Sequence, residues 1–264
     1  MNFLRRSKFY SNSSRHYIKI DNSRISKKNR FARTSIKNLH FKNGRCFFFG
    51  KITAWHKGGG PKNLFRKLNF SNTNYNCIVL NLQYDPCRNS FIFLNFDLVN
   101  YIFFRTTALI NVFPGALLNC NLVIQDLKLG SRTKITNIPI GSIIHNLSRN
   151  YYSIAQFIRS AGTKAQIIQK NKQKAILRLP SNLFIRVSVH SFASIGIISN
   201  LNKKYTVLGK AGRNRLLGNR PITRGIAMNP VDHPHGGRTN GGCPSVTPWG
   251  LPTKSGFRLK RKKN

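Results

Sequence analysis

The sequence contains very little negative charge. Its 264 residues include no glutamate and only five aspartates, against 45 lysines and arginines, so the formal net charge is +40. Repulsion of that size opposes compaction unless counter-charges lie close to the chain. The expected partner is therefore a phosphate polymer. An anionic membrane would also attract this chain, but we find no basic amphipathic helix that could lie on one.

Long apolar runs are also missing. The most apolar stretch, residues 91–118, is interrupted by Asp97, Arg105 and Pro114. It never reaches the roughly 18 uninterrupted apolar residues of a membrane span. The chain is nevertheless 40% hydrophobic and 11% aromatic, which is enough to bury a core. Its length suits two small domains with extensions.

Cysteine is scarce and irregularly spaced. The five cysteines are odd in number and form no C-x-x-C pair; they are Cys46, Cys77, Cys87, Cys120 and Cys243. This pattern indicates reduced, mostly structural thiols and not a disulfide framework.

Residues 39–118 have the pattern of a small β-barrel. The strand-like runs are residues 45–56, 64–70, 76–84, 90–96 and 101–106. Turn residues separate them at Asp85–Asn89 and Phe113–Gly115. Five short strands with a cationic glycine loop fit an OB-type barrel.

Residues 119–199 predict a second small barrel. We expect a turn and a strand within residues 136–147, and a helical turn over Ala155–Thr163 closed by Gly162. Short alternating strands are predicted over residues 165–170, 175–179 and 183–188, with a hairpin turn at Pro180–Asn182. No internal repeat relates the two predicted barrels.

A glycine-rich loop, Lys57-Gly58-Gly59-Gly60-Pro61-Lys62, follows the first predicted strand. Three glycines let backbone N–H groups approach phosphates, and Lys57, Lys62, Arg66 and Lys67 add charge nearby. The loop lacks the Gly-Lys-Ser/Thr ending of a P-loop. The alternative, a plain hairpin tip, remains open from the sequence.

The C-terminal stretch is the least regular part of the chain. From Gly209 onward lie 10 of the 20 glycines and 6 of the 11 prolines, and no period of 2 or 3.6 runs through it. Its cations include Lys210, Arg213, Arg215, Arg220, Arg224 and Arg238. Such a segment should be disordered alone and ordered by a polyanion. The tail Lys260–Lys263 is suited to sequence-nonspecific phosphate contact.

Residues 1–38 carry 11 lysines and arginines with only Asp21. This composition is typical of a mitochondrial transit peptide and also of a basic arm that lies on nucleic acid. We favour the arm and expect it to be retained, since an organelle-encoded protein needs no import signal. The predicted division is 1–38, 39–118, 119–199 and 200–264.

Three rival functions were weighed. Asp232, His233 and His235 are acid–base residue types, but no nucleophile and orienting group accompany them on a rigid scaffold, so no enzyme and no catalytic residue is predicted. A zinc site of His233, His235 and Cys243 would have three ligands where structural zinc takes four, so no metal site is predicted. A free-standing nucleic-acid-binding factor should show a recognition helix or compact patch, whereas charge here spreads from residue 5 to residue 263.

Several motifs in collinear order resemble one family. They are Gly50–Thr53 with His56 and Gly58–Gly60, Tyr84–Pro86 with Arg88, Asn137–Gly141 with His145, Gln156–Thr163, Gly209–Gly212, Met228–Gly237 and Thr247–Gly250. Over about residues 44–250 the chain resembles the universal bacterial-type L-two family of large-subunit ribosomal proteins. The resemblance implies a mainly β fold, with an OB-fold barrel, then an SH3-like barrel, and extended basic N- and C-terminal segments.

The resemblance also implies a structural role in translation. It implies binding to large-subunit ribosomal RNA, with the Met228–Gly237 loop near the peptidyl-transferase region and the second barrel toward the small subunit. Other ribosomal proteins are expected as neighbours, with no cofactor beyond Mg²⁺ or K⁺ held through the RNA. The expected RNA-binding residues are Lys51, His56, Lys57, Gly58, Gly59, Gly60, Lys62, Arg66, Lys67, Arg88, Arg159, Lys210, Arg213, Arg215, Arg220, Arg224, Asn229, His233, His235, Gly236, Gly237, Arg238 and Trp249.

The chain departs from the family pattern in places. Pro61 stands where the family usually has His, Asn69 where it often has Asp, and the acids of the second barrel are missing. The drift toward Asn, Phe, Ile and Lys indicates an organellar version, in a mitochondrion in preference to a plastid. The alternative function is a free-standing RNA-binding protein of an organelle.

Overall fold

The computed structural model describes residues 4–23, 25, 36–38, 44–46, 48–71, 75–120, 127–237 and 244–253. The chain divides into two compact units. The first unit comprises Met1–Phe41 and Pro61–Arg213, and the second comprises Lys42–Gly60 and Asn214–Asn264. Each unit is described by itself below.

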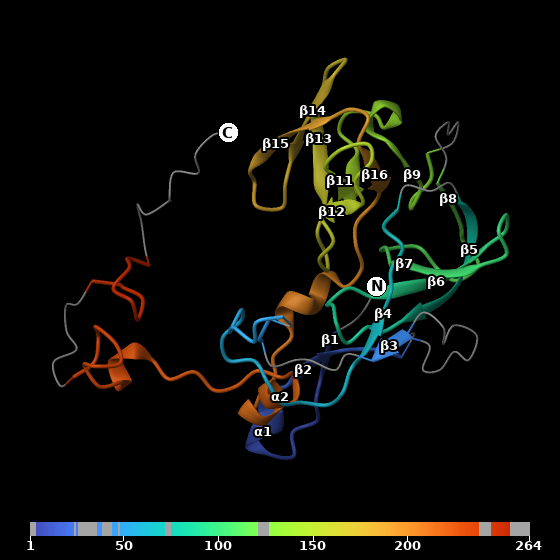
Figure 1. Ribbon diagram of the computed structural model, residues 1–264. Helices are drawn as coiled ribbons and strands as arrows, with labels where there is room; N and C mark the ends of the chain where they lie inside the picture. The colour runs from blue at the N-terminus through green and yellow to red at the C-terminus, as the bar shows by residue number, and fades with distance from the viewer. Residues whose placement is uncertain are drawn as a thin grey trace. The chain divides into compact units, whose positions relative to one another are not determined.

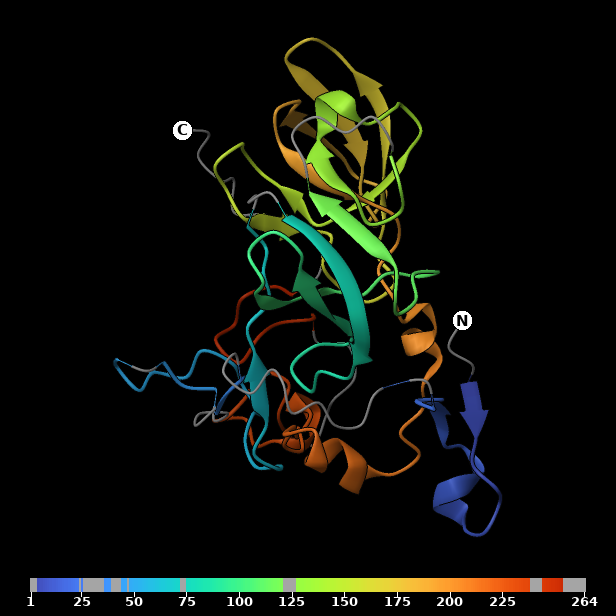
Figure 2. The same cartoon turned by 90° about the vertical axis from the view of Figure 1, so that its right-hand side faces the viewer.

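The first barrel is built from antiparallel strands (Figure 1). They are β3 (Ile36–Asn38), β4 (Leu64–Arg66), β5 (Tyr75–Gln83), β6 (Ile92–Asp97), β7 (Phe103–Thr107) and β8 (Leu117–Cys120). β5 pairs with β6 and β8, β6 also pairs with β7, and β3 pairs with β4. Tyr75, Cys77 and Val79 alternate along β5 and are buried in its core, as expected of a strand with one inward face. The register of β5 against β6 shifts between Val79 and Asn81, and Figure 2 shows β5 curving along its length, which helps a sheet close into a barrel.

The second barrel follows directly. Its elements are β9 (Arg132–Lys134), η2 (Ile135–Asn137), β10 (Ile143–His145), β11 (Leu147–Ser148), β12 (Ala155–Phe157), β13 (Ala165–Lys170), β14 (Lys174–Arg178), β15 (Phe184–Ser188) and β16 (Phe192–Ile195). Aliphatic side chains with no solvent exposure fill its core, among them Ile135, Ile144, Ile167 and Leu177. The predicted strands at residues 165–170, 175–179 and 183–188 are confirmed as β13, β14 and β15, with the predicted turn between β14 and β15 at Pro180–Asn182.

One hydrogen-bonded sheet connects the two barrels within the first unit. Its order is β15-β14-β13-β10-β16-β9-β8-β5-β6-β7, and β8 and β9 pair in parallel through Cys120 and Arg132. The Asn146 side chain donates to the Thr107 hydroxyl at 2.6 Å, and the Ser199 amide donates to the Ala108 carbonyl at 2.9 Å. The fold is therefore mainly β, an OB-fold barrel followed by an SH3-like barrel.

Short elements lie outside the barrels. β1 (Leu4–Arg6) pairs with β2 (Ile18–Ile20), with α1 (Asn12–Arg15) between them, and Ile18 forms a bridge with Val207. After β16 come η3 (Leu201–Tyr205), α2 (Ala211–Leu216) and η4 (Gly225–Ala227). The sequence predicted none of these short helices. Among the described residues, none of the helices has the length and apolar character needed to cross a membrane.

Two predicted elements were wrong. Residues 45–56 were expected to form a strand, but the described residues make only an isolated bridge between Arg45 and Ile52. Gly44 and Gly50 have φ values of +68° and +62°, which reverse the chain at both ends of that bridge. Residues 155–163 were expected to form a helical turn, but they begin with strand β12, which pairs with β11. Ala155 and Phe157 are paired with Ser148 and Leu147 of β11, and Gly162, with φ of +69°, ends a turn and not a helix.

The grouping of segments also differs from the linear division. Residues 42–60, expected within the first barrel, belong to the compact unit formed with residues 214–264. The predicted four-part division by residue number stays a prediction. The grouping matters for function because it places the glycine loop with the C-terminal stretch.

Candidate nucleic-acid interface

A compact loop opens the second unit. The Gly44 carbonyl accepts hydrogen bonds from the amides of Thr53 (2.7 Å) and Ala54 (3.0 Å), which close the base of the loop. At its tip Phe48 and Phe49 are 84% and 80% exposed. Phe48 and Phe49, which made this segment resemble a strand, are therefore not part of a core.

The glycine loop packs against residues 214–220 of the same unit. The Gly58 amide donates to the Gly218 carbonyl at 2.9 Å, and the Arg220 amide donates to the His56 carbonyl at 2.9 Å. The Lys57 ammonium donates to the Asn219 side chain at 2.7 Å. These bonds fix the path of two segments that are more than 150 residues apart in the sequence.

The three glycines of this loop share a backbone conformation but differ in the space around them. All have positive φ: 148° at Gly58, 71° at Gly59 and 82° at Gly60. A Cβ on Gly60 would lie 2.9 Å from the Leu216 carbonyl oxygen, so protein packing excludes a side chain there. A Cβ on Gly59 would meet nothing closer than an Arg215 nitrogen at 3.8 Å. The backbone of Gly59 is thus exposed and open to approach by another molecule.

A hollow of about 800 Å³ lies beside this loop. It is lined by residues of the second unit only: Arg45, Ile52, Ala54, Trp55, His56, Lys57, Gly58, Gly59, Arg215, Arg220 and Pro221. Four of these side chains are permanent cations and none is an acid. Such a lining attracts phosphate groups and repels cationic ligands.

Two tryptophans meet in the same unit. The ring centroids of Trp55 and Trp249 are 5.9 Å apart, with 55° between the ring planes. Trp55 also lines the hollow. Aromatic surface beside a cationic groove is a typical feature of proteins that bind single-stranded nucleic acid.

The Met228–Gly237 loop is organised around a buried histidine. His233 is only 7% exposed, and its Nδ1 accepts a hydrogen bond from the His235 amide at 3.0 Å. A Cβ on Gly225 would lie 2.6 to 2.7 Å from three atoms of the His233 ring. A Cβ on Gly236 would lie 2.3 Å from the Asn229 carbonyl oxygen. The glycines of this loop therefore make room for the ring and for the loop's own backbone.

The neighbouring side chains are placed differently. His235 Nε2 lies 2.6 Å from the Pro244 carbonyl oxygen and 3.4 Å from the Val246 amide nitrogen. Asn229 and Asp232 are exposed, and among the described residues no side-chain ion pair or hydrogen bond of Asp232 is found. Arg238, which follows this loop in the sequence, lies outside the described residues.

Comparisons with known proteins agree with this geometry. Residues 32–107 match the family model "Ribosomal Proteins L2, RNA binding N-terminal domain", and residues 128–250 match "Ribosomal Proteins L2, C-terminal domain". The chain belongs to the ribosomal protein L2 family.

Individual relatives cover most of this L2 chain. It is 44% identical over 222 residues to "Large ribosomal subunit protein uL2m" of Reclinomonas americana, covering 81% of this chain and 79% of the relative. It is 38% identical over 257 residues to "Large ribosomal subunit protein uL2" of Rickettsia prowazekii (strain Madrid E), covering 95% and 92%. The relatives thus include an organellar, mitochondrial-type L2 and bacterial L2 proteins.

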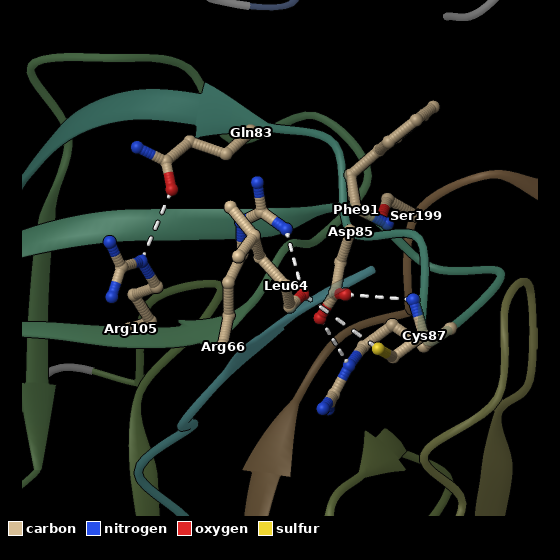
Figure 3. Close-up of polar contacts among 9 residues, drawn as sticks. Leu64, Arg66, Gln83, Asp85, Cys87, Phe91, Arg105 and Ser199 are labelled. Atoms are coloured by element: carbon tan, nitrogen blue, oxygen red, sulfur yellow. Dashed lines mark hydrogen bonds and ion pairs between the residues drawn. The ribbon is translucent and has the colours of Figure 1, made fainter. Parts of the chain in front are cut away.

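Other predicted RNA-binding cations of this L2 protein lie in the first unit, and two of them, Arg66 and Arg88, contact protein atoms. Arg88 Nε donates to the buried Asp85 carboxylate at 2.7 Å. The Cys87 amide donates to the same carboxylate at 2.9 Å (Figure 3). Arg66 donates to the Leu64 carbonyl at 3.3 Å. The Arg88 guanidinium is therefore already engaged in an ion pair within the protein. Its contact with RNA stays a prediction.

Buried polar groups hold the L2 barrels together. In the first barrel Arg105 is 2% exposed and donates to the Gln83 side chain at 3.2 Å (Figure 3). Burial lowers the pKa of Arg105, as does the nearby charge of Arg66. In the second barrel burial, and then the charge of Arg132, lower the pKa of His145 to about 3. These groups are structural and do not form part of the exposed cationic surface.

The remaining first-unit positions are mostly exposed. Arg159 lies over the Phe70 ring at 5.0 Å and Arg213 lies over the Tyr17 ring at 3.6 Å. Lys62, Lys67 and Lys210 are exposed. Their contacts with RNA also stay predictions, as do those of Lys51 and Arg224, which are exposed in the second unit.

Five residues that line the hollow are absent from the predicted RNA-binding set: Arg45, Ile52, Ala54, Trp55 and Pro221. Arg45 and Trp55 are the two of these with a charged or aromatic side chain. Arg45 Nη1 donates to the Gly50 carbonyl at 3.0 Å and lines the hollow. A tryptophan directly before His56, in a cationic loop, was the available signal for Trp55. It was misread as part of a strand because aromatic residues are also favoured in strands.

Proposed function

We propose that this protein is a structural constituent of the large ribosomal subunit of a mitochondrion, and that its second unit binds ribosomal RNA through the hollow beside Gly58–Gly60. The proposal rests on the cationic lining of that hollow. The two segments that form the second unit contain a single acid, Asp232. A lining of this kind recognises phosphates.

Membership in the L2 family supports the ribosomal setting. Relatives carry the name of a large-subunit protein, and the matched N-terminal family model is described as RNA-binding. We infer that the Met228–Gly237 loop supports the architecture of the peptidyl-transferase region and that the second barrel supports association with the small subunit. Other ribosomal proteins are its neighbours in this proposal.

The protein acts in this proposal without catalysing a reaction. No group of three or more His, Cys, Asp and Glu side chains that could hold a metal lies within the described part of the chain. His233 Nδ1 is already an acceptor within its loop, which argues against a proton-transfer role at that nitrogen. Any Mg²⁺ or K⁺ would be held through the RNA.

The mitochondrial location rests on the similarity to the uL2m protein and on the drift in composition. Similarity to Rickettsia proteins is nearly as high. We infer a mitochondrion over a plastid, and fractionation of the tagged protein with mitochondrial ribosomes tests the inference. Recovery with plastid ribosomes would overturn it.

The central experiment measures binding of the full chain to large-subunit ribosomal RNA as salt is varied. If roughly ten phosphates are neutralised, log K should fall with log salt with a slope of about −7 to −9. Arg215→Gln with Arg220→Gln, both in the lining of the hollow, should weaken binding and reduce the slope by about 1.4 to 1.8. Both side chains are exposed, so the pair should leave folding intact.

A charge-matched control separates site from net charge. Lys174→Gln with Arg186→Gln removes the same two charges from β14 and β15, away from the hollow's lining. We expect a smaller loss of affinity than with the Arg215 and Arg220 pair. Equal losses, or a flat salt response of the original chain, would contradict the proposal. If the tagged chain is absent from large-subunit particles on a gradient, the alternative function, a free-standing RNA-binding protein, would be favoured.

A further inference from the structure

The tryptophan pair is more exposed than its contact would suggest. Trp55 and Trp249 are the only two tryptophans of the chain, and their rings meet although 194 positions separate them. Yet Trp55 is 57% exposed and Trp249 is 68% exposed. Two aromatic side chains brought together in a core would hide most of their surface. Here much of each ring remains available for another molecule.

The angle between the rings is consistent with this availability. A tilt of 55° means that the two indoles form a wedge and do not stack face to face. A planar group can therefore stack on the open face of either ring. Aromatic rings stack on the π-face of any nucleobase, whatever its identity.

The cationic side chains near the tryptophan pair favour a negatively charged ligand. Trp55 lines the same hollow as Lys57, Arg215 and Arg220. The guanidinium of Arg220 has no hydrogen bond or ion pair to other described residues, and its Cδ lies 3.6 Å from where a Cβ on Gly58 would be. Planar aromatic surface and open cationic groups thus lie at one site. A nucleotide supplies both a planar base and a phosphate, so one ligand satisfies both features.

The form of the RNA follows from the stacking. In a duplex each base is already stacked between its neighbours and cannot cover an indole, whereas bases in loops, bulges and ends can turn outward. We propose that Trp55 and Trp249 stack an unpaired RNA base whose flanking phosphates lie along the hollow beside Lys57, Arg215 and Arg220. This inference rests on the proposed function and adds which form of RNA the hollow takes.

The test uses intrinsic fluorescence of the full chain, because all of its tryptophan emission comes from this pair. The probes are two RNA hairpins with the same stem and the same tightly structured tetraloop, whose bases stack within the loop; one has a single bulged adenosine in the stem and the other has a fully paired stem, so the bulge is their only difference. The bulged hairpin should quench the emission and bind more tightly than the paired one, which should leave the emission nearly unchanged. Trp55→Ala should weaken binding of the bulged hairpin by about 10- to 100-fold and leave the paired hairpin unaffected.

Two further variants keep the result interpretable. Trp55→Phe retains an aromatic face and should recover part of the preference for the bulge. Ile52→Ala truncates a half-exposed, non-aromatic side chain that lines the same hollow, and should keep the preference. Loss of the preference in Ile52→Ala as well as Trp55→Ala would indicate a general effect on loop shape and would overturn the stacking assignment.

The outcomes separate the two proposals. If both hairpins bind equally and neither quenches the emission, base stacking is wrong while RNA binding stands. If neither hairpin nor ribosomal RNA binds at low salt, the proposed function itself is wrong. If polyglutamate quenches the emission and the bulged hairpin does not, the pair faces an acidic protein segment and the RNA assignment is overturned.

Discussion

Adjacent glycines in the loop beside the hollow offer a quantitative test of the structure. Gly59 and Gly60 both have left-handed backbones, with φ of +71° and +82°. An alanine at either position carries the left-handed penalty of roughly 1 to 2 kcal/mol. Only at Gly60 would the new Cβ also meet fixed backbone atoms, 2.9 Å from the Leu216 oxygen and 3.2 Å from the Gly218 nitrogen.

The difference between the two variants isolates this contact. Backbone atoms cannot rotate away as a side chain can, so Gly60→Ala should carry an additional overpacking cost of about 1 to 3 kcal/mol. Gly59→Ala meets only the flexible end of Arg215 at 3.8 Å and should avoid that cost. We therefore expect the loop to open about 5- to 150-fold more often in Gly60→Ala than in Gly59→Ala.

Amide hydrogen exchange measures this opening directly. The Gly58 and Arg220 amides donate to the Gly218 and His56 carbonyls at 2.9 Å each, and both should exchange faster in Gly60→Ala by the factor above. Amides of β13 in the second barrel should be unchanged and serve as the internal control. Equal exchange in Gly59→Ala and Gly60→Ala would refute the packing of the glycine loop against residues 214–220.

Three other predictions concern buried groups. Burial lowers the pKa of His145 from 6.5 to about 3, so between these pH values the histidine is protonated in the unfolded chain and neutral in the folded chain. The free energy of unfolding should therefore fall as pH drops from about 6.5 toward 3, by up to about 1.4 kcal/mol per pH unit. Denaturation curves of His145→Gln should show a weaker dependence on pH. Burial raises the pKa of the Cys77 and Cys120 thiols to about 12 and about 11, so alkylation at pH 8 with peptide mapping should label the exposed Cys87 and spare both until the protein unfolds. In Gly225→Ala the new Cβ would displace the His233 imidazole, at an overpacking cost of about 1 to 3 kcal/mol. Hydrogen exchange of the amides in the Met228–Gly237 loop should therefore be about 5- to 150-fold faster, and unchanged exchange would show that the ring does not pack on Gly225.

The barrels were largely predictable because their signals are local. Ala165 and Ile167 lie two positions apart on β13, as do Ala175 and Leu177 on β14, and each of these four side chains is buried in the second barrel. Turn chemistry also located the hairpin between β14 and β15, where Asn182 takes a φ of +63°. By contrast, the exposed aromatics Phe48 and Phe49 resembled strand residues because composition alone does not reveal whether a face is buried.

The association of distant segments could not be read in the same way. Two contacts join parts of the chain that share no periodicity: the β-bridge between Lys57 and Asn219, and the ring contact between Trp55 and Trp249. Composition correctly marked both segments as cationic, and the family resemblance marked several of their residues as RNA-binding. Only the structure shows that they form one unit with a common hollow.

The position of His233 differs from what its motif predicts. A histidine in a Gly/Pro-rich loop was expected to face RNA, yet its ring is buried, packs on Gly225 and accepts from the His235 amide. The loop instead presents Val231, 91% exposed, and the exposed Asp232 at its surface. His233 thus sets the shape of the loop from within, because its ring fills the space that the glycines leave. Removal of the ring would therefore change the path of the exposed turn, and contact of its Nδ1 with any other donor would require the internal hydrogen bond to break first.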